Sequence, residues 1–166
     1  MTITTLKDLY IDQLQDLYSA NRQAAQVTRE LKEAAGSAEL RKALGAGVDG
    51  IEQGMELLKQ LIENHDANPR GEHCKGMEGL AAEARAHGVD ADFTDEDVRD
   101  ASIIAQYQRM THYGISGYGT ARAFAQKLGL DNDASVLGQC LDDTRGGDRK
   151  MTMIASGEVN PAAAEA

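Results

Sequence analysis

The chain has 166 residues, of which 42% are hydrophobic and 4% aromatic, and its net charge at pH 7 is −10. This length fits one domain with a core of its own. Nucleic acids and anionic membranes repel a strongly acidic chain, so we expect neither as a partner. No apolar run approaches the roughly 20 residues of a membrane span, and the first residues show no signal-peptide pattern. With two cysteines outside any zinc spacing, we expect a cytoplasmic protein with free thiols.

Apolar residues recur at intervals of three and four along most of the chain, which predicts helices and no sheet. The first helix is expected over residues 5–35, with Thr4 or Thr5 as its N-cap and Gly36 as its stop signal. The second helix is expected over residues 37–64. Because only a short turn separates these two helices, they should be antiparallel neighbours.

A long connection follows over residues 66–93, and residues 74–86 within it predict a short amphipathic helix. The third long helix should begin at Thr94, which has the capping-box spacing with Asp97, and should run to Leu128. The fourth is expected over residues 132–155.

Two helical hairpins joined by a long crossover are typical of ferritin-like four-helix bundles. We therefore expect an all-α fold of that kind, with a short extra helix in the crossover between helices 2 and 3. Residues 1–156 should form this single domain, and residues 157–166 should form a flexible tail.

Residues 45–54 carry four glycines inside the expected second helix. Each interior glycine costs a helix roughly 0.8–1 kcal/mol relative to alanine, so tertiary structure must offset about 3–4 kcal/mol here. Two interpretations stay open. The glycines could allow close packing against Gly114 and Gly117 of the third long helix. Alternatively, they could leave a cavity, reached by Asn21, Thr111, His112, Tyr18 or Tyr118.

Several strings in the chain resemble one known family. They are Asp8-Leu9-Tyr10 with residues 17–23, Pro69-Arg70-Gly71 with residues 74–80, Arg99-Asp100-Ala101, Ile104-Ala105, and His112-Tyr113-Gly114-Ile115 with Tyr118-Gly119-Thr120. Together, over about residues 6–155, they are similar to the YciF/YciE family of bacterial ferritin-like stress proteins. The resemblance implies a ferritin-like bundle that is commonly a homodimer, a link to stress responses, and no settled activity.

A di-iron site in such a bundle needs several carboxylates that face one point. The resemblance places neutral residues of this chain where the family has Glu or Gln, and Thr144 at the inward position of helix 4. It thus implies that the di-iron site is degenerate and holds no cofactor. What is left would be a vestigial site or pocket formed by Asn21, Gly50, Gly54, Thr111, His112, Gly114 and Thr144. Iron or another divalent metal stays open as an alternative, with Glu52, His112 and Asp143 as relocated ligands.

The sequence shows no motif that pairs a nucleophile with a base, so a non-catalytic, stress-associated binding or structural role is favoured. One alternative is a metal-dependent oxidase or iron-handling protein with a relocated site. Another is a binder of a small molecule in the vacated bundle centre. We expect a homodimer that uses exposed apolar residues of the first two helices. A weaker alternative is a surface metal site in the crossover, formed by His65, Glu72, His73, Cys74 and His87.

Overall fold

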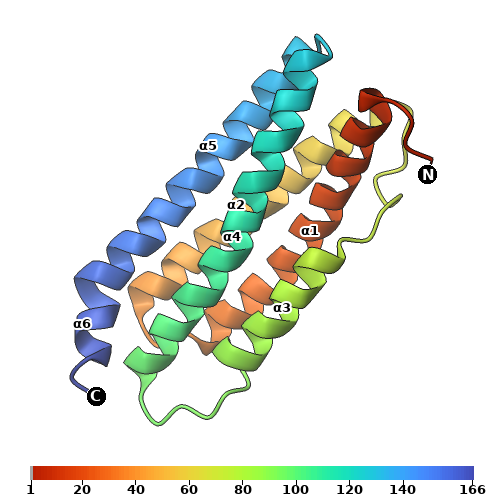
Figure 1. The fold of residues 1–166 in the computed structure, drawn as a ribbon. Helices are drawn as coiled ribbons and strands as arrows, with labels where there is room; N and C mark the ends of the chain where they lie inside the picture. The colour runs from red at the N-terminus through yellow and green to blue at the C-terminus, as the bar shows by residue number, and fades with distance from the viewer. Residues whose placement is uncertain (1) are drawn as a thin grey trace.

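The computed structural model describes residues 2–166 and contains helices but no strand in that range. Four long helices lie side by side: α1 (Leu6–Ala34), α2 (Ala38–Glu63), α4 (Glu96–Lys127) and α5 (Asp131–Ile154) (Figure 1). The shorter helix α3 (Lys75–Gly88) packs on α1 and α4. The all-α expectation is confirmed. None of the helices in residues 2–166 has an apolar stretch long enough for a membrane span.

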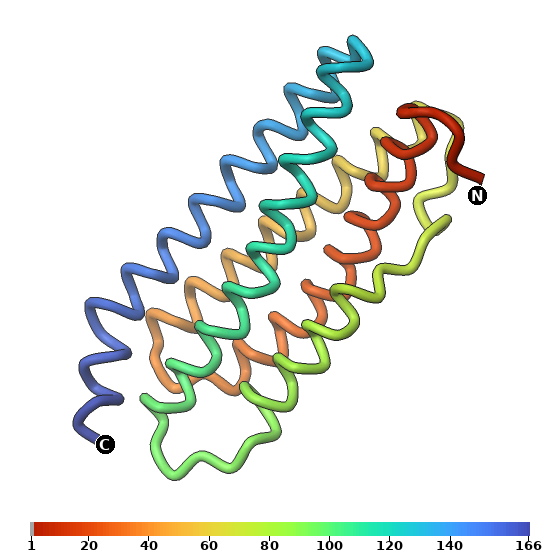
Figure 2. The backbone as a smooth tube through the Cα atoms, viewed as in Figure 1, coloured from red at the N-terminus to blue at the C-terminus, as the bar shows by residue number. Residues whose placement is uncertain are grey.

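The backbone forms two antiparallel hairpins, α1–α2 and α4–α5, and the segment that carries α3 connects them from one end of the bundle to the other (Figure 2). The adjacent pairs of long helices are α1–α2, α4–α5, α1–α4 and α2–α5. Helices α2 and α4 therefore face each other across the diagonal. The α2–α5 pair is the least closely packed of the four adjacent pairs.

Side-chain caps fix where the long helices begin. The hydroxyl of Thr5 accepts a hydrogen bond from the backbone of Asp8, whose carboxylate accepts one from the backbone of Thr5, which completes a capping box. Ser37 caps α2 without a reciprocal bond: its hydroxyl accepts a hydrogen bond from the backbone N–H of Leu40. Both caps satisfy N–H groups that have no partner within the helix.

Helix α4 begins at Glu96, and its N-cap lies one residue later than the sequence predicts. Its N-cap is Asp95 and not Thr94, because the Asp95 carboxylate accepts hydrogen bonds from the backbone N–H groups of Asp97 and Val98. An aspartate is the stronger N-cap of the two neighbours. The capping-box assignment to Thr94 was therefore wrong.

The core consists of two clusters of buried apolar side chains. One includes Leu31, Leu40 and Ile103, and the other includes Leu14 and Leu137. Each cluster combines residues of both hairpins, so burial of apolar area holds the hairpins together.

The C-terminal residues differ from the expected flexible tail. A π-helical turn, η1 (Ala155–Val159), and helix α6 (Asn160–Ala163) continue α5, and Val159 is 1% exposed. Ile154 and Val159 are five residues apart, which in a regular α-helix would put them on different faces. The π turn brings both onto the core side, and α-helical periodicity therefore missed it.

Candidate functional site

A cavity of about 1030 Å³ extends along α2 from Ala38 to Leu57 and is lined by residues of both core clusters. Its volume is at the upper end of the range for sites that hold small molecules, about 300–1,000 Å³. Exposed residues of α2 and α5 form its mouth, among them Glu39, Lys42, Gly50, Asp142, Asp143 and Lys150. The cavity thus opens to solvent between α2 and α5, the least closely packed pair of helices.

Two of the α2 glycines face tyrosine hydroxyls that reach across the diagonal from α4. A Cβ atom at Gly54 would lie 2.7 Å from Tyr118 Oη, and one at Gly47 would collide with the hydroxyl of Tyr107. Gly50, which lies between them, faces open space with no atom within 4 Å of such a Cβ. The glycine segment therefore combines close contacts at two positions with the cavity at the third.

Packing of the α2 glycines against Gly114 and Gly117, one of the two interpretations left open by the sequence, does not occur. The atom nearest to a Cβ at Gly114 is Thr144 Cγ2 of α5, at 3.8 Å, while Gly117 lies against Leu17 of α1. The reason is the diagonal placement of α2 and α4, which a sequence pattern alone does not specify.

The buried wall of the cavity carries a small number of polar groups. Asn21 Nδ2 donates a hydrogen bond to Tyr118 Oη at 2.6 Å. Thr111 Oγ1 donates to the carbonyl of Tyr107 at 2.9 Å, and Thr144 Oγ1 donates to the carbonyl of Cys140 at 2.6 Å. Both hydroxyl protons are already used in hydrogen bonds to backbone carbonyls. On the cavity side, each threonine oxygen can therefore only accept a hydrogen bond.

Thr28 is the exception among these polar groups. Its side chain is completely buried, it lines the cavity, and its Oγ1 has no hydrogen-bond partner. A buried hydroxyl without a partner is costly, and because Thr28 has no accessible surface, a molecule in the cavity does not reach it.

Burial keeps the titratable groups of this wall in their uncharged forms. It raises the pKa of Cys140 to about 11 and raises the pKa values of Tyr107 and Tyr118 above their ordinary range. A thiolate or phenolate would lose its hydration here without an opposite charge beside it. The inner part of the cavity is therefore uncharged near neutral pH.

Six of the seven residues predicted for the vestigial site line the cavity: Asn21, Gly50, Gly54, Thr111, Gly114 and Thr144. His112, the seventh, does not line the cavity: its side chain is 64% exposed and its Nε2 lies 3.1 Å from Asp148 Oδ2. Each helical residue is turned by about 100° from the one before it. This rotation directs His112 away from the cavity that Thr111 faces.

Several residues that line the cavity were not predicted from the sequence as part of the site. They are Thr28, Met77, Tyr107, Met110 and Met151. Thr28 falls on the apolar spacing of the first helix, and this spacing is the one sequence signal that its side chain points inward. A methionine or tyrosine on such a spacing cannot be distinguished from ordinary core.

The relocated metal ligands do not come together. Glu52 pairs with Arg29, and His112 with Asp148, while Asp143 is at the mouth of the cavity. The crossover histidines separate too: His65, His73 and His87 each pair with a different carboxylate. Within residues 2–166, no three His, Cys, Asp or Glu side chains form a group that could hold a metal ion.

A family model described as a domain of unknown function, DUF892, matches residues 5–164. The chain belongs to the DUF892 family. Protein YciF of Escherichia coli (strain K12) is 32% identical to it over 161 residues, 96% of each chain. The resemblance to the YciF family is thereby confirmed.

Two solved structures share the fold of this DUF892 chain. The crystal structure of the E. coli stress protein YciF matches with a TM-score of 0.88 at 31% identity and covers 95% of this chain and 99% of the other. YcfI from Rhodopseudomonas palustris, whose proposed role is structural, matches with a TM-score of 0.86 at 29% identity, with coverage of 92% and 96%.

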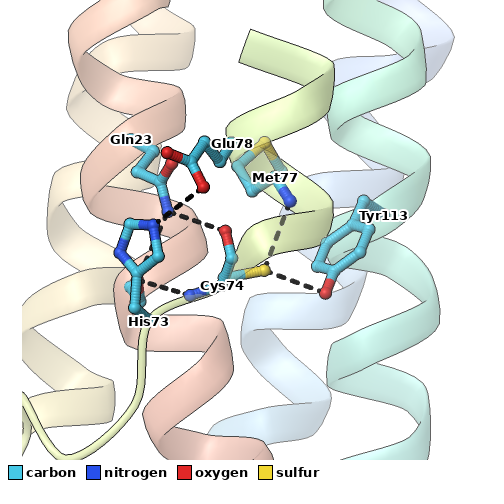
Figure 3. Close-up of polar contacts among 7 residues, drawn as sticks. Gln23, His73, Cys74, Met77, Glu78 and Tyr113 are labelled. Atoms are coloured by element: carbon cyan, nitrogen blue, oxygen red, sulfur yellow. Dashed lines mark hydrogen bonds and ion pairs between the residues drawn. The ribbon is translucent and has the colours of Figure 1, made fainter. Parts of the chain in front are cut away.

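A second polar cluster in this DUF892 chain lies where α3 begins (Figure 3). Cys74 Sγ accepts a hydrogen bond from the backbone of Met77 and lies 3.0 Å from Tyr113 Oη, which donates to Asp16 at 2.8 Å. The backbone N–H of Cys74 donates to Ser19 Oγ at 3.0 Å. Burial raises the pKa of the Cys74 thiol. The hydrogen bonds of this cluster connect α3 to α1 and α4.

A third cluster lies at the end of the bundle where α1 and α5 begin and α2 ends. Tyr10 Oη donates to Asp133 Oδ2 at 2.8 Å, and His65 Nε2 lies 2.7 Å from the same oxygen. Lys7 Nζ lies 2.7 Å from His65 Nδ1. This network connects α1, α5 and the end of α2, and it accounts for the burial of a carboxylate at Asp133.

Proposed function

We propose that this DUF892 chain is a ferritin-like, stress-associated protein in which the centre of a four-helix bundle is a non-catalytic binding cavity and not a di-iron site. One observation carries the proposal. The cavity is lined by six residues that the family resemblance relates to the metal site, and none of the six has an ionisable side chain: Asn21, Gly50, Gly54, Thr111, Gly114 and Thr144.

The donor atoms at the cavity do not fit two iron ions. The buried wall offers amide, hydroxyl, thiol and thioether groups, whereas two divalent cations in a low-dielectric core require several carboxylate oxygens. The carboxylates that touch the cavity are exposed at its mouth: Glu39, Asp142 and Asp143. Glu39 is already paired with Lys150 at 2.8 Å.

The relatives support the stress association in general terms. The matched E. coli protein is described as a stress protein, and the R. palustris protein has a proposed structural role. The likeness extends over nearly the whole of each chain. A structural role is the second candidate, and it would leave the cavity without a ligand.

A homodimer is part of the proposal, on the basis of the family resemblance. The exposed apolar face expected on the first two helices is not present. The large hydrophobic residues that are exposed within residues 2–166 are Ile3, Val98 and Met153, all outside α1 and α2. Sedimentation equilibrium at micromolar concentration should give twice the chain mass of 17.8 kDa. A single-chain mass would count against the dimer.

Metal analysis tests the absence of a di-iron site. Protein purified without chelators from cells supplied with iron and manganese should contain far less than one equivalent of either metal per chain. The triple variant Asn21→Glu, Gly50→Glu, Gly114→Glu returns carboxylates to three cavity positions and is the matched comparison, which should gain iron. One or more equivalents of tightly held iron or manganese in the unmodified chain would refute the proposal.

A further inference from the structure

We infer that the side chain of Lys7 is a site of covalent acylation by small acyl thioesters, with His65 as the base that takes a proton from its ammonium group. Asp133 holds the imidazole in position. The three residues meet at the end of the bundle, and none of them lines the cavity. The inference therefore goes beyond the proposed function and does not depend on it.

The geometry of the cluster fixes where the proton of neutral His65 lies. Its Nε2 is 2.7 Å from Asp133 Oδ2, and a carboxylate only accepts hydrogen bonds, so Nε2 is the donor. Nδ1 of the neutral ring is then an acceptor, and it lies 2.7 Å from Lys7 Nζ. The amine, the imidazole and the carboxylate thus follow one another as a nucleophile, its base and the group that orients the base.

The carboxylate of Asp133 is placed to stabilise an imidazolium. Its side chain is 10% exposed, and it accepts a second hydrogen bond from Tyr10 Oη at 2.8 Å. Burial raises the pKa of Tyr10, so this hydroxyl stays a donor at neutral pH. A proton that moves to His65 creates a cation beside the carboxylate, where the low dielectric strengthens their attraction.

The nearby helix ends favour the same proton transfer. Lys7 is in the first turn of α1, where the positive end of the helix dipole disfavours an ammonium group. His65 directly follows the C-cap of α2, and the negative end of that helix favours an imidazolium. The Tyr10 ring, 5.8 Å from Lys7 Nζ, favours the cation only weakly at that distance.

Lys7 also lacks the ion pair that would hold its side chain in the charged form. Among residues 2–166, no carboxylate lies within ion-pair distance of its amine. The side chain is partly exposed at the end of the bundle, beside the exposed residues 2–5. A small molecule can therefore reach the amine from solvent while the imidazole lies behind it.

Acylation by a thioester balances with the groups that this cluster holds. His65 Nδ1 takes one proton from the ammonium group of Lys7 and leaves a neutral amine. The amine nitrogen attacks the thioester carbonyl, so that a C–N bond forms and the C–S bond breaks. The departing thiolate takes the second proton, the third stays on the amide nitrogen, and His65 releases its proton to water. Because thiols are far more acidic than amines, the thiolate leaves readily and the site needs only a base.

Acetylation by N,S-diacetylcysteamine, a small uncharged acetyl thioester, measures the reactivity of each lysine. Peptide mass spectrometry of the whole chain, incubated near neutral pH, gives the initial rate at each site. Lys75 is the internal control: it is exposed in the first turn of α3, and its histidine neighbour, His73, pairs with Glu78. Lys7 should be acetylated at least tenfold faster than Lys75. Equal rates at the two lysines would overturn the site.

His65→Gln tests the base. Glutamine can still accept a hydrogen bond from Lys7 and donate one to Asp133, but it does not take up a proton. The rate at Lys7 should fall to about the rate at Lys75. The matched control is His87→Gln, at an exposed histidine that pairs with Glu83, and it should leave the rate at Lys7 unchanged. A fast Lys7 in His65→Gln would refute the role of the imidazole.

Asp133→Asn tests the positioning role of the carboxylate. Asparagine can still accept hydrogen bonds from Tyr10 and the imidazole, but it has no charge to stabilise an imidazolium. The rate at Lys7 should fall at least threefold, while the rate at Lys75 in the same sample stays the same. A general loosening of the fold would not lower the reactivity of Lys7 alone. An unchanged rate at Lys7 would show that Asp133 has no part in the reaction.

The unmodified protein provides a test that needs no variant. The titratable groups in contact with His65 are Lys7 and Tyr10 of α1 and Asp133 of α5. The ratio of the Lys7 rate to the Lys75 rate should fall toward one between about pH 8 and about pH 5, because an imidazole that is already protonated cannot accept the ammonium proton. A ratio that stays constant over this range would overturn the proton transfer.

Discussion

Gly50 and Gly54 are one helical turn apart on α2, yet they have opposite surroundings. Gly50→Ala should stabilise the protein by about 0.5–1 kcal/mol, because the methyl group enters open space and the helix gains propensity. Gly54→Ala should destabilise it by about 1 kcal/mol or more. Its Cβ would displace Tyr118 Oη, and overpacking of about 1–3 kcal/mol exceeds the gain in propensity. Urea unfolding of both variants checks the opposite signs, and equal effects would contradict the structure.

Asp8 gives the stability of the protein a dependence on acidic pH. Hydrogen bonds from the backbone and hydroxyl of Thr4, and then from Thr5, lower the pKa of Asp8 to about 2. A depressed folded-state pKa contributes stability above the ordinary pKa of 3.8, and this contribution is lost as the pH falls toward 2.

Asp8→Asn should therefore be less stable than the unmodified protein near neutral pH. The difference should shrink as the pH falls from about 4 to about 2, where the carboxyl of the unmodified protein becomes protonated. Urea unfolding at a series of pH values measures this, with Asp49→Asn, at an exposed position on α2, as the control. A difference independent of pH would count against the capping carboxylate.

At the scale of elements, the start of α3 depends on a cysteine cap. Cys74→Ala removes the acceptor for the backbone of Met77 and the partner of Tyr113, and it should cost about 1–2 kcal/mol. Cys74→Ser keeps a capping oxygen and should be more stable than Cys74→Ala by about 1 kcal/mol. Denaturation followed by circular dichroism compares them. Equal stability would show that the sulfur does not act as a cap.

The π turn after α5 contributes one fully buried side chain, Val159, to the core. Removal of residues 157–166 exposes the surface that Val159 covers and should cost about 1.5–3 kcal/mol. Removal of residues 164–166, which are exposed, is the control and should have no effect. The two truncated proteins can be compared by thermal unfolding. Equal melting temperatures would restore the flexible tail that the sequence suggested.

Helix positions follow from the sequence to within one or two residues. Apolar spacing, Thr5 and Ser37 as caps, and the turn at Gly36 are local signals that act within a few residues. The π turn was not predictable, because it departs from the α-helical period on which the prediction depends. The choice between Thr94 and Asp95 depends on which side chain reaches the free N–H groups.

At the scale of the whole molecule, the cavity was one of two open interpretations and could not be chosen from the sequence. The outcome depends on which helices are adjacent and which are diagonal, and on the reach of Tyr107 and Tyr118. The family resemblance named seven positions, and six of them line the cavity. His112 lies outside the cavity because a one-residue step on a helix changes the face, and the unsatisfied hydroxyl of Thr28 is visible only in three dimensions.

The glycine-rich α2 packs least closely against α5, and this has a consequence for the motions of the protein. Local openings with a small free-energy cost occur where packing is sparse and the helix is intrinsically weak. Amide hydrogens near Gly50 should therefore exchange with solvent sooner than those of α1 and α4. The same fluctuation would widen the mouth of the cavity, so a molecule of the kind proposed for the bundle centre would enter at the rate at which α2 opens.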